Sequence, residues 1–208
     1  FAAGYSGKIY KTTDGGNHWS LYLLPTRLAL SSIYFPDALH GWVTGTYGIV
    51  FQTTNGGATW YRSPTGNTST HTMNSVYFVD ALTGWAVGVH GTIINTTDGG
   101  LTWNPQPSGT AASLNAVAFT DALNGWAVGD FGMILSTQDG GESWLRQASG
   151  TQYKLTAVAF SDASKGLAVG RQGTIIRYTN DPYAAQQTSS ARLNSVQVYP
   201  NPFNPATM

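Results

Sequence analysis

The strongest constraint on the fold of this chain is a repeat of about 41 residues. A tryptophan follows a Gly-Gly pair at Trp19, Trp60, Trp103 and Trp144, with spacings of 41, 43 and 41 positions. One repeat contains three short strand-like runs, at residues 74–80, 84–88 and 91–97, and a fourth that opens at Trp103. Four short strands in a unit of this size are typical of one propeller blade. The sequence therefore predicts an all-β fold, a β-propeller of about five four-stranded blades over residues 1–180.

The two ends of the chain depart from the repeat. The first strands of the later repeats have Val or Ile and Phe at alternate positions, as a strand with one buried face requires, at residues 32–35, 75–78, 116–119 and 157–160. Residues 1–23 supply only the second, third and fourth strands of a blade. Residues 193–199 read Leu-Asn-Ser-Val-Gln-Val-Tyr, which matches the first-strand pattern at residues 114–120. This C-terminal strand is a candidate for closing the ring and hiding exposed edges; the alternative is an open part of a larger ring.

The turn before each repeated tryptophan resembles the Asp box, Ser/Thr-x-Asp-x-Gly-x-Thr-Trp. Its acceptor residues are Asp14, Asn55, Asp98 and Asp139. We interpret them as structural, because such a side chain accepts hydrogen bonds from following backbone N–H groups while glycine takes a positive φ. Asn55 supports this interpretation, since an amide oxygen accepts the same bonds without a charge. The tryptophans are expected to cover the blade cores, and the aspartates of a second repeated turn are also read as turn formers, at Asp37, Asp80, Asp121 and Asp162.

The opposite face is expected to carry the variable part of each repeat. Antiparallel strands reverse at every turn, so the Gly-x-x-Gly tips between second and third strands open away from the Asp boxes. Their residue pairs differ from blade to blade, which makes one residue of each tip a candidate ligand contact, at Tyr5, Tyr47, His90, Phe131 and Arg171. The polar loop 63–74 is expected to join this surface. The alternative is that the tips vary because nothing constrains them.

Charge and composition exclude several partners. Ten Lys+Arg balance ten Asp+Glu, and no basic run could neutralise a line of phosphates, so we expect no nucleic-acid partner. No apolar run reaches the roughly 20 residues of a membrane-spanning helix. The chain has no cysteine, and its histidines show no ligand spacing, at His18, His40, His71 and His90. We expect neither a metal nor a cofactor.

The repeat SVYFVDALTGWAVGVHGTIINTTDGGLTW resembles that of the photosystem II stability/assembly factor family, whose members are Asp-box (BNR-like) propellers. The resemblance covers residues 1 to about 180 and implies the propeller fold. The photosynthetic members use an arginine-rich patch, whereas the six arginines of this chain are scattered along the sequence.

Asp boxes also occur in sialidases and xyloglucanase-like glycoside hydrolases, whose catalysis requires other groups. A sialidase needs an arginine cluster and a tyrosine activated by a glutamate, and other glycosidases need paired carboxylates. The single glutamate, Glu142, lies in an Asp-box turn, and Asp130 is the one non-repeated acid expected on the tip face. We therefore predict no enzyme activity, with a glycoside hydrolase-like protein as an alternative.

The C-terminal end, Val-Tyr-Pro-Asn-Pro-Phe-Asn-Pro-Ala-Thr at residues 198–207, resembles the opening of the type IX secretion C-terminal sorting domain. This resemblance implies export to the cell surface or medium. Residues 181–192 would be a linker, and residues 193–208 either the closing strand or the start of the sorting domain. The predicted function is an exported, non-catalytic scaffold that binds a protein or glycan. The alternative is a structural subunit that self-associates through edge strands or the tail.

Overall fold

A computed structural model of the chain describes residues 1–65, 70–162 and 164–179. These residues form five small antiparallel sheets, which confirms the predicted all-β fold and the number of blades. Three sheets have four strands, and the first and last have three. The strands are β1 (Ala2–Ala3), β2 (Lys8–Lys11), β3 (Ser20–Leu23), β4 (Leu30–Tyr34), β5 (Gly41–Gly45), β6 (Val50–Thr53), β7 (Tyr61–Ser63), β8 (Met73–Phe78), β9 (Gly84–Gly88), β10 (Ile93–Thr96), β11 (Asn104–Gln106), β12 (Leu114–Phe119), β13 (Gly125–Gly129), β14 (Ile134–Thr137), β15 (Leu145–Arg146), β16 (Leu155–Asp162), β17 (Lys165–Gly170) and β18 (Ile175–Thr179).

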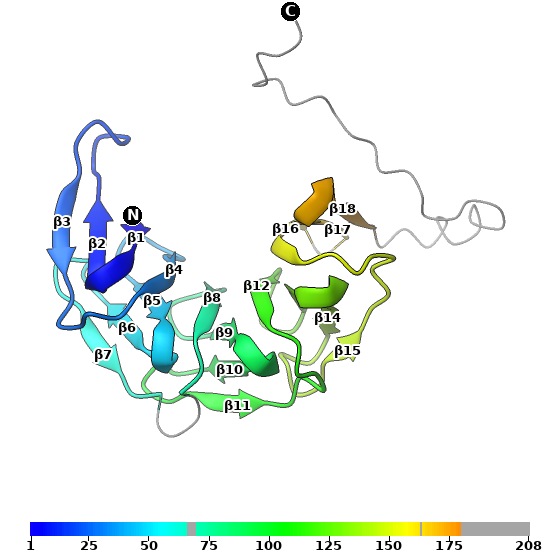
Figure 1. Cartoon of the computed structure of the whole chain (residues 1–208). Coiled ribbons are helices and arrows are strands. Elements are labelled where there is room, and N and C mark those ends of the chain that lie inside the picture. Colours follow the sequence, from blue (N-terminus) through cyan, green and yellow to red (C-terminus); the bar gives the residue numbers. More distant parts are fainter. Residues whose placement is uncertain (66–69, 163, 180–208) are drawn as a thin grey trace, which may run out of the picture.

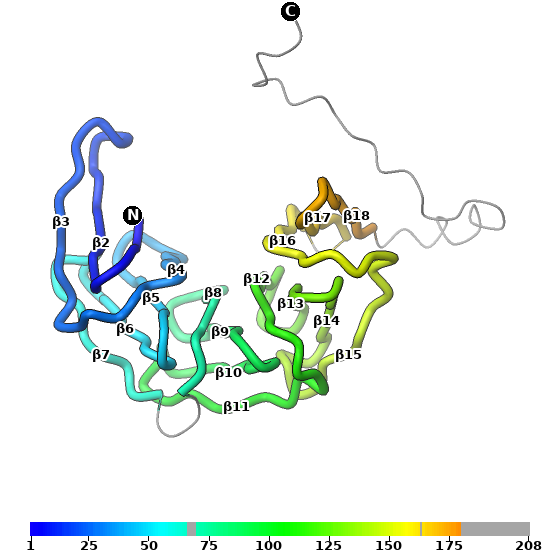
Figure 2. Tube along the Cα trace, in the orientation of Figure 1, coloured from blue at the N-terminus to red at the C-terminus, as the bar shows by residue number. Residues whose placement is uncertain are grey.

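The five sheets are arranged as an arc (Figure 1). The first strands of the last four sheets, β4, β8, β12 and β16, line its inner side, and consecutive members contact one another. The last strands, β7, β11 and β15, lie on the outer side. The Cα trace shows the N-terminal sheet and the β16–β18 sheet at opposite ends of the arc (Figure 2).

The repeated glycines of the second strands allow close packing. A Cβ at Gly84 would overlap the Phe78 ring, and a Cβ at Gly88 would overlap the carbonyl oxygen of Thr72. Both glycines flank Trp85, on a strand that is buried throughout. The same overlaps recur at the equivalent glycines of β5, β13 and β17. The two glycines of each of these strands thus leave room for a phenylalanine ring and for a neighbouring backbone segment.

Aromatic rings interlock neighbouring blades. The second-strand Trp42 stacks on Phe78 of the next blade, with ring centroids 3.5 Å apart, and Phe78 meets the Asp-box Trp103 edge-on at 5.9 Å. Trp85, Phe119 and Trp144 repeat these distances in the following blade. Such pairs are favourable beyond the area that they bury, so each blade core is completed by its neighbour.

The two ends of the arc lack parts of this interlock. The first sheet has no inner strand among the described residues, as predicted, and no phenylalanine covers Trp19, which is 48% exposed. The expectation that the Asp-box tryptophans cover the blade cores holds for Trp60, Trp103 and Trp144 but is wrong for Trp19.

The last sheet exposes the face that other blades bury against a neighbour. Leu167 is 50% exposed, whereas Trp126 at the equivalent position is 7% exposed. Val169 and Ile175 on the same sheet are exposed as well.

The predicted linker, closing strand and sorting segment, residues 181–208, lie outside the described residues. In the part of the chain that the structure describes, no helix is long and apolar enough to cross a membrane.

Candidate functional site

The five Gly-x-x-Gly tips form short turns on one face of the arc. They are η1 (Tyr5–Gly7), η2 (Thr46–Gly48), η3 (Val89–Gly91), η4 (Asp130–Gly132) and η5 (Arg171–Gly173). Tyr5, Tyr47 and Phe131 are 83%, 71% and 74% exposed. Three aromatic side chains therefore extend into solvent from separate tips.

The second residue of each tip has a left-handed backbone. The residues are Ser6, Tyr47, His90, Phe131 and Gln172, with φ between 55° and 58°. None is glycine, although glycine adopts this conformation without steric cost and aromatic residues rarely do. This conformation could not be predicted from the sequence, because the residue types normally found there, Gly, Asn and Asp, are absent from all five positions.

The candidate contacts predicted from the sequence fall on two different positions of the tips. Tyr47, His90 and Phe131 occupy the left-handed second position, whereas Tyr5 and Arg171 occupy the first. The structure therefore places the five side chains on one face, but they do not occupy equivalent positions in the five tips. The loop expected to join them is described only in part, because residues 66–69 lie outside the described residues.

The second to fifth tips are each held by the loop that enters the blade. The backbone N–H of Val89 donates to the Thr72 carbonyl at 3.0 Å, and that of Asp130 donates to the Ser113 carbonyl at 2.9 Å. The last tip glycine packs against the loop that leaves the blade, since a Cβ at Gly132 would overlap the Thr151 carbonyl oxygen. Tips and blade-to-blade loops thus meet on one face, and these contacts fix the tip backbones.

Asp130 is the acidic residue at the tips. Its carboxylate accepts a hydrogen bond from Asn115 at 2.9 Å and forms an ion pair with Lys154 at 3.1 Å. Burial acts to raise the pKa of Asp130, but the bonds from Asn115 and Lys154 and the charge of Arg171 outweigh it and leave the pKa lowered. Asp130 is therefore ionised at neutral pH. Asn115 and Lys154 were not identified from the sequence as partners of Asp130. The one sequence feature that could have pointed to Asn115 is that β8 and β12 both have asparagine at their second position, at residues 74 and 115.

The tip face also brings two histidines together. The rings of His71 and His90 lie 4.9 Å apart, and His71 Nδ1 is 2.9 Å from the Thr92 hydroxyl. No group of three or more metal-ligating side chains occurs in residues 1–65, 70–162 and 164–179.

The Asp boxes lie on the opposite face and are engaged in their own turns. In the third blade the backbone N–H of Thr102 donates to Asp98 Oδ1 at 2.9 Å, and the Thr102 hydroxyl donates to Oδ2 at 2.6 Å. Asn55 accepts the equivalent backbone bond from Thr59, also at 2.9 Å. The predicted turn geometry is confirmed for both residue types.

Hydrogen bonds lower the pKa of the Asp-box aspartates. For Asp98 the largest cause is the Thr102 hydroxyl, and for Asp139 it is the Ser143 hydroxyl; both pKa values fall from 3.8 to about 2. The pKa of the Asp14 carboxyl is also lowered to about 2, chiefly by the hydrogen bond from the backbone N–H of His18. These carboxylates stay charged and hydrogen-bonded, which is the state a turn-forming acceptor needs.

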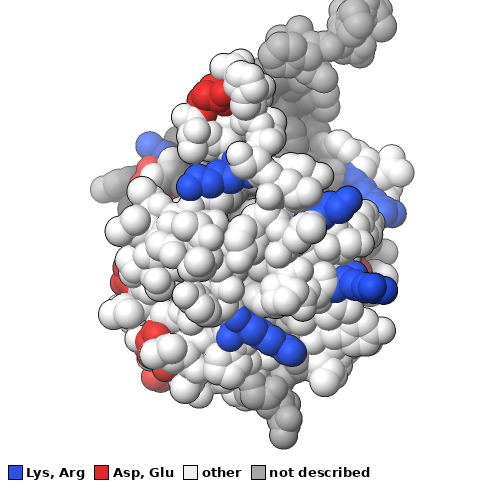
Figure 3. Space-filling view, turned by 90° about the vertical axis from the view of Figure 1, so that its left-hand side faces the viewer, with Lys and Arg blue, Asp and Glu red and all other residues white. Residues whose placement is uncertain are grey.

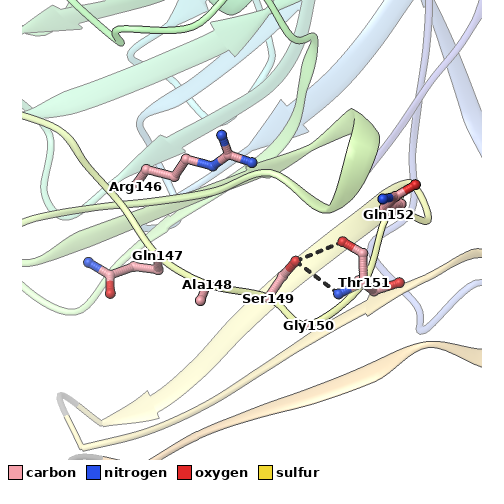
Figure 4. A pocket seen from close by; sticks show the side chains of 7 residues that line it. All are labelled: Arg146, Gln147, Ala148, Ser149, Gly150, Thr151 and Gln152. Atoms are coloured by element: carbon pink, nitrogen blue, oxygen red, sulfur yellow. Dashed lines mark hydrogen bonds between the residues drawn. The ribbon is translucent and has the colours of Figure 1, made fainter.

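A hollow of about 630 Å³ is lined by residues 146–152 of one loop (Figure 4). Ser149 Oγ bonds both the Thr151 carbonyl, at 3.1 Å, and the Thr151 backbone N–H, at 3.3 Å. Ser108 and Thr110 make the same pair of bonds one blade earlier. Because this hollow borders a repeated turn, it belongs to the framework.

Charged side chains do not gather on the side of the molecule seen in Figure 3. Its Lys and Arg residues appear as separate spots on a mostly uncharged surface, with acidic residues towards the edge. This view agrees with the scattered arginines of the sequence.

Comparison with known proteins gives the family. The profile of the family described as "Photosynthesis system II assembly factor YCF48" matches residues 64–153 and 112–179, together more than half of the chain. The chain belongs to the YCF48 family. This agrees with the resemblance of the repeat and with the four Asp-box turns of the five-sheet arc. No curated protein sequence matches the chain significantly.

Solved structures share the fold of this YCF48-family chain at low sequence identity. YCF48 from Cyanidioschyzon merolae has a TM-score of 0.69 at 18% identity, over 84% of this chain and 64% of that one. The GH74 enzyme of Niastella koreensis has a TM-score of 0.68 at 13% identity, over 86% of this chain and 33% of that one. A structure described as "YCF48 bound to D1 peptide" is 17% identical over 86% of this chain and 89% of that one, but its TM-score of 0.45 is too low to relate individual residues. The chain thus spans just under two thirds of the Cyanidioschyzon merolae YCF48 and one third of the Niastella koreensis enzyme.

Proposed function

We propose that this YCF48-family propeller is a non-catalytic scaffold that binds a protein partner through its tip face. The observation that carries the proposal is the left-handed backbone of the second tip residue, where a non-glycine side chain is kept in all five blades. Strained backbone of this kind costs on the order of 1–3 kcal/mol per residue and gathers at functional sites. Membership of a family of assembly factors supports a protein as the partner, with a glycan as the alternative.

The non-catalytic part of the proposal is supported by the state of the carboxylates. The aspartate on the tip face, Asp130, is held by Lys154 and Asn115 and has a lowered pKa. A glycosidase general acid needs a raised pKa and a second carboxylate across the substrate. The fold shared with a GH74 enzyme carries no chemistry by itself.

The test of the binding surface is the double variant Tyr47→Ala/Phe131→Ala. We expect capture of partners from the source organism's surface or medium fraction to fall at least tenfold, while the thermal midpoint changes little, because both side chains are exposed. The matched control is Leu39→Ala/Leu82→Ala, which removes two exposed side chains from the Asp-box face. Unchanged capture by the tip variant would refute the tip face as the binding surface.

We further propose that the protein is exported, from the resemblance of residues 198–207 to a type IX sorting segment. Fractionation of the source organism with an antibody to residues 1–180 tests this. Retention of the protein inside the cell would contradict the proposal.

Self-association is the second candidate function, favoured by the exposed apolar face of the last sheet. Leu167, Val169 and Ile175 offer a surface that the other blades bury. Light scattering over a hundredfold range of concentration tests it, since a mass that rises with concentration and is lowered by Leu167→Asn would support assembly. A constant monomer mass would remove this candidate.

A further inference from the structure

The concave side of the arc carries a second hollow that the tips do not form. Its volume is about 340 Å³, and it lies over the inner strands β4, β8, β12 and β16. Its lining consists of serine, tyrosine, alanine, valine, isoleucine and phenylalanine residues and includes no charged side chain.

This hollow coincides with a break in the repeat. The fifth residue of each inner strand is tyrosine in two blades and alanine in the next two, at Tyr34, Tyr77, Ala118 and Ala159. The rings of Tyr34 and Tyr77 pack together with centroids 4.6 Å apart and a tilt of 36°. The row of rings therefore ends at Tyr77, and the next two blades present methyl groups where the first two present phenols.

A second position of the same strands changes at the same point. The third residue is serine in two blades and then alanine, at Ser32, Ser75, Ala116 and Ala157. The backbone N–H of Val76 donates to Ser32 Oγ at 3.3 Å, and that of Val117 donates to Ser75 Oγ at 3.4 Å. One half of the concave surface thus has hydroxyl groups and rings, and the other half has small apolar side chains.

We propose that the alanine half of this hollow binds a neutral aromatic side chain of a partner polypeptide, which continues the row of rings beyond Tyr77. This inference rests on the proposed protein-binding function and adds a pocket to it. The precedent is one blade earlier, where the Tyr34 ring packs against Tyr77 between the β4 and β8 strands. A ligand ring beside Tyr77 would occupy the corresponding place between the β8 and β12 strands.

The lining decides the class of ligand. A charged group would lose its hydration without gaining a partner, since no charged residue borders the hollow. A sugar would need hydrogen-bonding groups for its hydroxyls, yet the four alanines at the third and fifth positions of β12 and β16 offer none. The Tyr34 hydroxyl stays neutral, because burial and then its hydrogen bond with Tyr77 raise its pKa. An aromatic ring needs only an apolar floor and a neighbouring ring face, and both are present.

The test uses the full chain and p-cresol, the side-chain analogue of tyrosine, in a nuclear magnetic resonance titration. We expect saturable binding in the millimolar range, with the largest shifts at Tyr77, Ala118 and Ala159. Methyl β-glucoside is expected to cause no saturable shift. Absence of saturable p-cresol binding, or tighter binding of the glucoside, would overturn the proposal.

Two variants fill the hollow with the side chain that the repeat itself uses. Ala159→Tyr and Ala118→Tyr, made separately, should each weaken p-cresol binding at least tenfold, because their own phenol occupies the space. Tyrosine is already accommodated at this strand position in two blades, and thermal unfolding checks that each variant folds. Tyr77→Leu removes the neighbouring ring without filling the space and should weaken binding threefold or more.

The matched control is Ala122→Tyr, which adds the same side chain at an exposed alanine in the turn between β12 and β13. It should leave p-cresol binding unchanged. Binding that survives both Ala159→Tyr and Ala118→Tyr would refute the pocket. The tip variant Tyr47→Ala/Phe131→Ala should bind p-cresol normally. Partner capture by this variant therefore tests the tip face, and p-cresol titration tests the concave hollow, so that either proposal can fail without the other.

Discussion

At the scale of single residues, the tips keep side chains at positions where glycine would relieve backbone strain. Tyr47 has φ of 55° and is 71% exposed, so its ring gains little from packing within the chain. We predict that Tyr47→Gly is more stable than Tyr47→Ala by about 1 kcal/mol, because only the alanine keeps a Cβ in the left-handed region. Urea unfolding of the two variants measures the difference, and equal stabilities would show that the turn is not strained.

The Asp boxes give a prediction for acid stability. Asp14, Asp98 and Asp139 have folded-state pKa values of about 2, below the ordinary 3.8. A lowered folded-state pKa contributes stability that is fully present above the unfolded-state pKa and is lost as pH falls through the folded-state pKa. We therefore expect the urea midpoint to be nearly constant between pH 5 and 7 and to fall from about pH 4 towards pH 2.

A triple Asp→Asn change at these three boxes provides the control for the acid effect. Asn55 shows that an amide accepts the same backbone bond, so the triple variant should fold. Its midpoint should depend less on pH below 4. If the urea midpoint of the triple variant fell with pH as in the unmodified protein, other carboxyl groups would be the cause of the acid sensitivity.

At the scale of the element, the inner strands owe their stability to rings from two blades. Phe119 is buried between Trp85 and Trp144, whereas Phe160 in the last blade is partly exposed and meets Trp126 and Tyr178. We predict that Phe119→Leu lowers the free energy of unfolding by about 1–3 kcal/mol through loss of two aromatic pairs, and that Phe160→Leu lowers it less. Calorimetric unfolding of the two variants compares them, and equal losses would contradict the interlock.

Sequence reasoning succeeded where one residue type has one physical role. The Asp-box acceptors and the missing first strand of blade one are both visible in the sequence, because the repeat shows which residue types each position requires. The left-handed tips were missed, because tyrosine, histidine and phenylalanine do not signal that backbone. The concave hollow was missed for another reason: the change from Tyr77 to Ala118 keeps the strand pattern intact and alters only the space beside it.

At the scale of the whole molecule, stability is expected to vary along the arc. The middle blades are packed on both sides, whereas the β16–β18 sheet leaves Leu167, Val169 and Ile175 in solvent. In a repeat fold the stability of each unit depends on its interfaces with neighbours. We predict that amides of β17 exchange with deuterium before those of β9 and β13, the equivalent strands of the middle blades. Mass spectrometry of proteolytic fragments measures this order, and simultaneous exchange would indicate a single cooperative unit.

The ring interlock also bears on how such a chain can change in length. Every full junction uses the same three groups, a second-strand tryptophan, an inner-strand phenylalanine and an Asp-box tryptophan, in nearly the same geometry. A tandem duplication of one unit between Trp103 and Trp144 would therefore meet a matching partner on both sides. Genes for proteins of this construction can gain or lose whole blades in one recombination event, and each product begins with its new junctions already complementary.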